Sequence, residues 1–161
     1  MIYPISALAG ILKTMQTPLN TETLIQNIQV LSDWEDRYKY IIQLGKQIPP
    51  LDPSYQINEN IVTGCMSKVW LICEAPDKID APFVFHAMSN AAIVNGLIAI
   101  LKILFRDKSA VDILKTDIEA IFIQLGLDQH LSPGRSNGFF SMVAKIKTLA
   151  TQDLQRLIKL A

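Results

Sequence analysis

The sequence predicts an α+β fold in which several helices pack against a small antiparallel sheet. Two short apolar segments with alternating side chains flank a proline-containing turn, which is the pattern of a β-hairpin. Segments with capping residues and helical spacing of apolar side chains precede and follow them. The chain has 161 residues, of which 50% are hydrophobic and 19% are charged. This length and composition predict one compact domain, residues 1–161, whose core needs no disulfide or metal.

Two helices are expected before the hairpin. Thr21 is predicted to cap a short first helix, and Ser32 and Glu35 to form the capping box of a second. The second helix is expected to end near Gly45, because the prolines at 49 and 50 cannot continue it.

The hairpin is predicted to lie between residues 68 and 88. Residues 51–62 are polar and are expected to form a crossing loop. Alternation from Lys68 onward predicts the first strand, residues 75–78 predict the turn, and residues 83–88 predict the antiparallel return.

The most apolar helix is expected directly after the hairpin. Residues 89–90 would cap it, and it would run to about residue 105 as the central core helix. Asn95 and Lys102 interrupt its apolar run, which is shorter than the roughly 20 apolar residues of a membrane span. No membrane association is therefore predicted.

Three more helices are expected in the C-terminal third. Capping boxes at residues 109–112 and 116–119 begin two of them, the second ending at Gly126. Residues 128–136 are expected to form a loop, and residues 137–160 the final helix, whose apolar side chains recur every three or four positions.

The charge balance and the cysteine count exclude several classes of protein. Fifteen basic residues balance fifteen acidic ones, so the chain lacks the positive field of a nucleic-acid or anionic-membrane binder. Two cysteines and two distant histidines form neither a disulfide framework nor a zinc site, and no metal or cofactor is predicted. Residues 1–12 are apolar without a basic leader region or a cleavage pattern, and we interpret them as folded or interfacial. We expect a soluble protein of the reducing cytoplasm.

Cys65 is the candidate functional residue, in the segment GCMSKVW (residues 64–70). A free cysteine is most often a small buried residue. Here Gly64 can adopt backbone angles closed to other residues, and the polar loop before it lies at the edge of the domain. The thiol is therefore expected at the mouth of the sheet, where a partner can reach it.

Two cations are candidates for activating this thiol, because the thiolate is the nucleophile. Lys68 follows Cys65 by three residues, and Arg135 lies in the segment PGRSNG, which is expected to be a loop. Either would favour the thiolate if the fold brought it close. The alternative is that Lys68 is a solvated strand residue and Arg135 a surface loop charge, and both interpretations stay open.

The other cysteine and the two histidines are interpreted as structural. Cys73 is expected in the core on one face of the strand, too far along the chain to bridge with Cys65. His86 is expected to be a sheet histidine and His130 a loop histidine. No local signature of a Cys/His hydrolase or of a nucleotide-binding loop is present.

Four blocks of the chain resemble one family, the SufE-like sulfur acceptors with their CsdE branch. The blocks are RYKYIIQLGKQIPPL at 37–51, NENIVTGCMSKVWL at 58–71, SNAAIVNGLIAIL at 89–101 and LGLDQHLSPGRSNGFFSMVAKI at 125–146. They follow the family order and span most of the chain from about residue 33 to 148. The first twenty residues are outside the resemblance.

The resemblance implies a SufE- and IscU-like α+β fold and a function as a sulfur carrier. Cys65 would take persulfide sulfur from a SufS- or CsdA-like cysteine desulfurase, an enzyme that uses pyridoxal phosphate. It would stimulate that enzyme and pass the sulfur to an iron–sulfur scaffold complex or another acceptor, as a carrier rather than a stand-alone enzyme. The supporting or partner-binding positions are Gly64, Met66, Ser67, Lys68, Trp70 and Arg135.

Three departures from the family pattern leave the cognate desulfurase open. Met66 stands where a polar residue is usual, Asn90 where the family often has Asp, and Asn95 where Lys or Arg is common. The competing functions are an iron–sulfur scaffold of similar fold, which would need about three or four cluster ligands, and an adaptor whose cysteine is incidental. We also expect Cys65 to rest against an apolar pocket, formed with Met66 and Trp70, and to swing out about Gly64 on docking.

Overall fold

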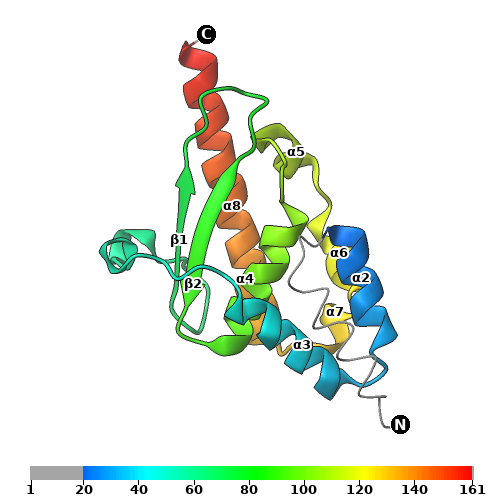
Figure 1. Cartoon of the computed structure of the whole chain (residues 1–161). Helices are drawn as coiled ribbons and strands as arrows, with labels where there is room; N and C mark the ends of the chain where they lie inside the picture. The colour runs from blue at the N-terminus through cyan, green and yellow to red at the C-terminus, as the bar shows by residue number, and fades with distance from the viewer. Residues whose placement is uncertain (1–19, 161) are drawn as a thin grey trace.

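The computed structural model describes residues 20–160 and confirms the predicted α+β class (Figure 1). The elements in chain order are α2 (Thr21–Val30), α3 (Trp34–Lys46), two 3₁₀ turns (Pro53–Tyr55 and Asn58–Asn60), β1 (Val69–Glu74), β2 (Val84–Ser89), α4 (Ala92–Leu104), α5 (Ala110–Lys115), α6 (Ile118–Gln124), α7 (Leu127–His130) and α8 (Pro133–Leu160). The interpretation of residues 1–12 as folded or interfacial lies outside the described residues. Within the described part of the chain, no helix is both long and apolar enough to cross a bilayer.

The predicted hairpin is confirmed as an antiparallel pair of β1 and β2. The register runs from Val69 opposite Ser89 to Glu74 opposite Val84. Val69 and Leu71 are buried on the face that packs on the core. In Figure 1 the long helix α8 passes behind the two strands, with α4 beside it.

Helix α4 is the core helix that its apolar composition predicted. Its buried apolar side chains are Ile93, Leu97, Ile98, Ala99, Ile100, Leu101 and Leu104. Helix α3 lies against α4 where Gly45 meets Gly96. A Cβ on either glycine would be too close to the backbone of the other helix, so the missing side chains allow this close approach.

The first two helices begin one residue away from the predicted caps. Asn20, not Thr21, caps α2 by accepting a hydrogen bond from Thr23 N. Asp33, not Ser32, caps α3 by accepting one from Glu35 N. In both places a residue with a hydroxyl group is next to an Asn or Asp residue. The amide or carboxylate oxygen of the Asn or Asp, rather than the hydroxyl, accepts the hydrogen bond from the free N–H group at the start of the helix.

The predicted caps of the later helices are right in one case and wrong in two. Ser109 caps α5 by accepting from Asp112 N, as predicted. Asp117 rather than Thr116 caps α6, because Thr116 uses its hydroxyl to bond the Asp112 carbonyl. Helix α4 has no side-chain cap, since its N-cap residue is Ala91.

The predicted loop at residues 128–136 is wrong, because helices occupy most of it. Helix α7 ends at His130, and α8 begins at Pro133. The Ser132 hydroxyl accepts a hydrogen bond from Arg135 N. Proline suits the first helical position because it needs no N–H partner there. Arg135 therefore lies in the first turn of a helix, not in a loop.

Candidate functional site

Cys65 lies on a turn that only glycine accommodates well. Gly64 has a φ of +93°, in the left-handed region that residues with a Cβ rarely adopt. A Cβ on Gly64 would also collide with the Ser141 hydroxyl on α8. The chain thus reverses at Gly64, directly against α8, before it enters β1.

The Cys65 thiol is half-buried against the first turns of α8. Its Sγ lies 3.5 Å from the carbonyl oxygen of Gly138, to which the S–H group donates. Gly138 has no Cβ between the helix and the thiol, and Cys65 atoms are the nearest neighbours of the position such a Cβ would take. The thiol is therefore seated on the helix without being sealed in the core.

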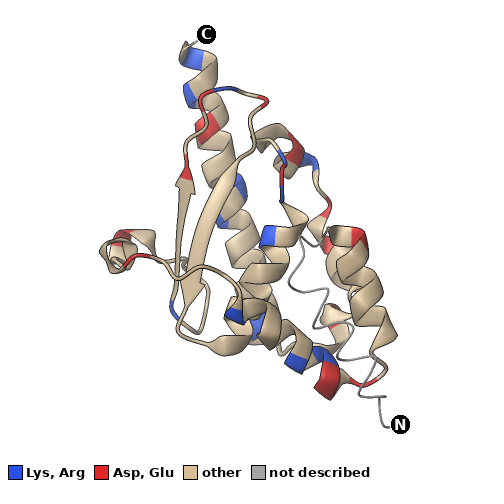
Figure 2. Ribbon diagram, viewed as in Figure 1, with Lys and Arg blue, Asp and Glu red and all other residues tan. Residues whose placement is uncertain are grey.

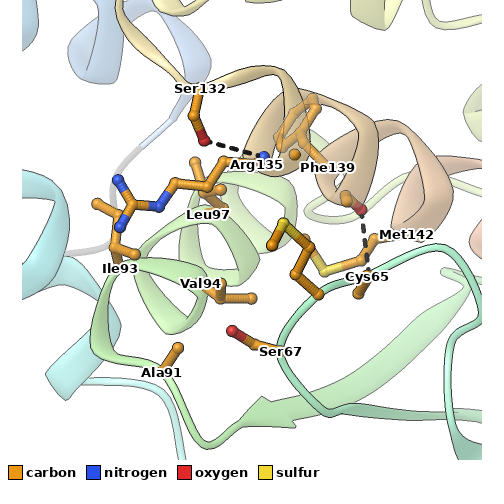
Figure 3. Close-up of a pocket in the computed structure, with 13 residues that line it drawn as sticks. Cys65, Ser67, Ala91, Ile93, Val94, Leu97, Ser132, Arg135, Phe139 and Met142 are labelled. Carbon is orange, nitrogen blue, oxygen red and sulfur yellow. Dashed lines mark hydrogen bonds between the residues drawn. The ribbon is translucent and has the colours of Figure 1, made fainter.

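A cavity of about 390 Å³ opens beside Cys65 (Figure 3). We call it the Cys65 cavity, and its walls come from the cysteine turn, the N-terminal turns of α4 and the start of α8. The residues that line it are Cys65, Met66, Ser67, Ala91, Ile93, Val94, Leu97, Ser132, Gly134, Arg135, Gly138, Phe139 and Met142. Most of these side chains are apolar, so the cavity offers sulfur a sheltered, weakly polar environment.

Burial raises the pKa of the Cys65 thiol above that of an ordinary cysteine. An apolar surrounding disfavours the charged form, so the thiol keeps its proton near neutral pH. The hydrogen bond to the Gly138 carbonyl also requires the protonated sulfur. Burial and this hydrogen bond both favour the protonated thiol.

The two candidate cations occupy different places relative to this cavity. Arg135 lines it, but in Figure 3 its guanidinium extends toward Ile93 and away from Cys65. Lys68 is exposed and is not among the lining residues. In this conformation neither cation offsets the effect of burial on the pKa of the thiol, and the Arg135 side chain is exposed.

Of the supporting positions Met66, Ser67 and Trp70, two line the Cys65 cavity and one does not. Met66 and Ser67 line the cavity, and Met66 is 90% exposed with its sulfur against Gly134. Trp70 is half-buried in β1, opposite Met88, and does not line the cavity. The expected pocket is thus present, with walls from α4 and α8 in place of Trp70.

Cys73 differs from its prediction as an inert core residue. It is only half-buried and lines a second cavity at the edge of β1. Both cysteines are free thiols. Cys73 packs partly against the core, and it borders the second cavity together with Lys145 and Leu149 of α8, so packing does not close over it completely.

Neither histidine lines the Cys65 cavity. The His86 ring lies 3.1 Å from a Glu74 oxygen across the hairpin. The His130 ring stacks on Trp34, and the backbone carbonyl of His130 accepts a hydrogen bond from the Tyr38 hydroxyl. Among residues 20–160, no group of three or more His, Cys, Asp or Glu side chains is arranged to hold a metal ion.

The sequence reasoning missed the contribution of α4 to the site. Ile93 and Leu97, one helical turn apart, form a wall of the cavity. Asn95 fixes this turn of α4 to the end of β2, since its side chain bonds both the N–H and the carbonyl of Ser89. The detectable signal was a polar side chain inside an otherwise apolar helix, directly after the strand.

Comparisons with known proteins agree with the earlier resemblance. Residues 22–150 match a family model described as "SufE: Fe-S metabolism associated domain". An uncharacterised SufE-like protein of Rhizobium meliloti (strain 1021) is 41% identical over 130 residues, which are 80% of this chain and 93% of that protein. The fold is similar to the solution structure of a hypothetical protein from Thermus thermophilus, with a TM-score of 0.68 and 14% identity over 84% of this chain and 96% of the other.

Proposed function

The chain belongs to the SufE family of iron–sulfur metabolism, and from this premise we propose that it carries sulfur on Cys65. Sulfur would come from the persulfide of a pyridoxal-phosphate-dependent cysteine desulfurase. The protein would stimulate that enzyme and deliver the sulfur to an acceptor for cluster assembly. The observation that carries the proposal is the Cys65 thiol, half-buried on a glycine turn at the mouth of an apolar cavity.

The proposed transfer is a displacement at sulfur. The Cys65 thiolate attacks the outer sulfur of the desulfurase persulfide, a new S–S bond forms, and the persulfide S–S bond breaks. The desulfurase cysteine leaves as a thiolate, and the transferred sulfur keeps its proton in Cys65–S–SH. No external oxidant or reductant is needed, because one S–S bond replaces another.

The cavity supports this function by protecting the product. A persulfide exposed to solvent is open to stray thiols and to oxidation. The Cys65 cavity, at about 390 Å³, has room for one further sulfur atom beside the thiol. In our proposal the cysteine turn moves outward to accept sulfur and returns to shelter it.

The exposed rim of the cavity supports a docking role. Met66 presents an apolar side chain that is 90% exposed, and the exposed Arg135 presents a charge next to Gly134, against which the Met66 sulfur lies. In the proposal a desulfurase contacts both while it draws the Cys65 turn outward. Outside the cavity the thiolate is no longer penalised by burial, and its nucleophilic fraction increases.

The test is desulfurase turnover, measured as alanine released from cysteine. Wild-type protein and Cys73→Ser are expected to stimulate turnover, whereas Cys65→Ser is expected to give only the basal rate of the desulfurase. Cys73→Ser is the matched control, because it removes a half-buried thiol of the same chain. Stimulation that survives in Cys65→Ser would favour an adaptor with an incidental cysteine and would contradict the proposal.

A further inference from the structure

A second cavity lies along the outer edge of β1, and we call it the edge groove. It has a volume of about 870 Å³ and is bounded by the 49–60 segment, β1 and α8. Its lining residues are Pro49, Pro50, Leu51, Asp52, Tyr55, Glu59, Asn60, Leu71, Ile72, Cys73, Glu74, His86, Lys145 and Leu149. None of them lines the Cys65 cavity, so the two openings are separate.

The edge of β1 in this groove has free backbone groups. Alternate residues of an antiparallel strand turn their N–H and C=O groups toward its partner. Lys68 O accepts from Asn90 N on the β2 side, whereas Val69 O accepts from Val62 N on the outer side. By this alternation the backbone N–H and C=O groups of Leu71 and Cys73 also point outward, away from β2.

Backbone pairing on the outer side of β1 ends partway along the groove. The isolated bridge between Ile61 and Trp70 is the last backbone pairing between the 49–62 segment and β1. Among residues 20–160, no backbone group forms a hydrogen bond with Cys73 on this outer side. Figure 1 shows the small 53–60 lobe beside the lower half of β1 and no ribbon along the upper half of that edge. Such an edge is a template for another strand.

The rim of the groove is acidic. Asp52 and Glu59 lie on the 49–60 segment, which contains no lysine or arginine, and Glu74 lies at the end of β1. Figure 2 shows acidic residues in red on the small 53–60 lobe and at the tip of β1. Lys145 on α8 is the one lysine or arginine among the lining residues. A positively charged ligand would complement this rim.

We propose that the edge groove binds an extended segment of a partner protein that carries basic side chains. The segment would add to β1 as a third strand, with main-chain hydrogen bonds to the Leu71 carbonyl and to Cys73 and its charges facing Asp52, Glu59 and Glu74. Tyr55, 48% exposed in the groove wall, offers an aromatic face to a lysine or arginine. A partner held here would leave the Cys65 cavity open for sulfur exchange.

A second copy of this chain fits the groove less well. A two-fold symmetric contact presents the same patch on both subunits. Pairing β1 with β1 would therefore bring two acidic rims together, which is unfavourable.

The chain contains its own reporter for this site. The variant Cys65→Ser leaves Cys73 as the one thiol, and Cys73 lines the edge groove. The probe is a short blocked peptide of alternating lysine and valine, with a peptide of alternating glutamate and valine as the matched control. The lysine peptide is expected to slow iodoacetamide labelling of Cys73 several-fold and to shift the amide NMR signals of β1, with weaker effects at high salt.

Charge variants test the recognition itself. Glu59→Lys is expected to reduce protection by the lysine peptide, whereas Glu119→Lys, an exposed acidic residue on α6, is expected to leave it unchanged. Three results would overturn the proposal: equal protection by the glutamate peptide, no protection with no shifts in β1, or a dimer in solution that already covers Cys73. Because Cys65 is absent from the assay, the outcome is independent of the sulfur-carrier proposal.

Discussion

At the scale of single residues, Cys65 combines two opposing properties. Its burial and its bond to the Gly138 carbonyl keep the thiol protonated. Its position on the Gly64 turn leaves the thiol at an opening rather than in the core. The proposed sulfur transfer needs the thiolate, so in our proposal the resting geometry protects the thiol and a change of environment activates it.

Alkylation of Cys65 measures this protection directly. In Cys73→Ser, iodoacetamide labelling is expected to rise with pH along a curve whose midpoint lies above that of a free cysteine. The reason is that the raised pKa in the folded protein leaves less thiolate at any pH below that midpoint.

Addition of a cysteine desulfurase at constant pH is expected to accelerate this labelling. The gain is about tenfold for each unit by which the pKa of Cys65 falls back toward its ordinary value. Urea-unfolded protein supplies the reference rate for an unprotected thiol. Equal rates with and without the desulfurase would show that the cysteine turn does not move.

Arg135→Ala tests whether the guanidinium contacts the partner. Its side chain is exposed and directed away from Cys65, so the fold is expected to stay intact. The concentration of this protein that half-saturates the desulfurase is expected to rise about two- to fivefold, the range of an exposed ion pair, and to rise less at high salt. Arg106→Ala, on another surface, is the control. Unchanged transfer kinetics would make Arg135 an ordinary surface charge.

At the scale of elements, the contact of α3 with α4 positions one wall of the Cys65 cavity. Gly45 and Gly96 allow the two helix backbones to touch. Asn95, the neighbour of Gly96, holds α4 to the end of β2. The Ile93–Leu97 wall is thus set by contacts on other faces of the same helix.

Substitutions at two glycines compare a position with no room for a side chain, Gly96, with a position that has room for one, Gly138. Gly96→Ala would push against Ile41 of α3 and is expected to cost about 1–3 kcal/mol of unfolding free energy. The expected fall in Tm is about 2–4 °C per kcal/mol for a chain of this size. Gly138→Ala would place its Cβ 3.6 Å from Cys65 Sγ, an ordinary contact, so Tm is expected to hold or to rise through better helix propensity. Equal losses in thermal unfolding of the two variants would refute this account of the α3–α4 contact.

The elements were predictable from sequence where local chemistry decides them. The alternation of Val69 and Leu71 predicted β1, and the apolar run after β2 predicted α4. The start of α8 was not predictable from the sequence, because Ser, Pro, Gly and Asn at residues 132–137 favour a loop by composition. A serine cap followed by proline at the first helical position satisfies the same residues within a helix.

At the scale of the whole molecule, the candidate site joins three distant segments. Residues 65–67, 91–97 and 132–142 all line the Cys65 cavity. The glycine before Cys65 predicted an exposed turn, and the family resemblance pointed to Arg135. The direction of Arg135 and the wall from α4 depend on how α4 and α8 pack, which local patterns do not encode. The functional roles of these residues stay predictions.

Mass spectrometry of the protein after incubation with a cysteine desulfurase and cysteine tests the central claim most directly. Each sulfur atom carried as a persulfide adds about 32 Da to a thiol. We expect this gain on the peptide that contains Cys65 in the wild type and in Cys73→Ser, and its loss in Cys65→Ser. No gain on Cys65, or a gain on Cys73 instead, would contradict the account.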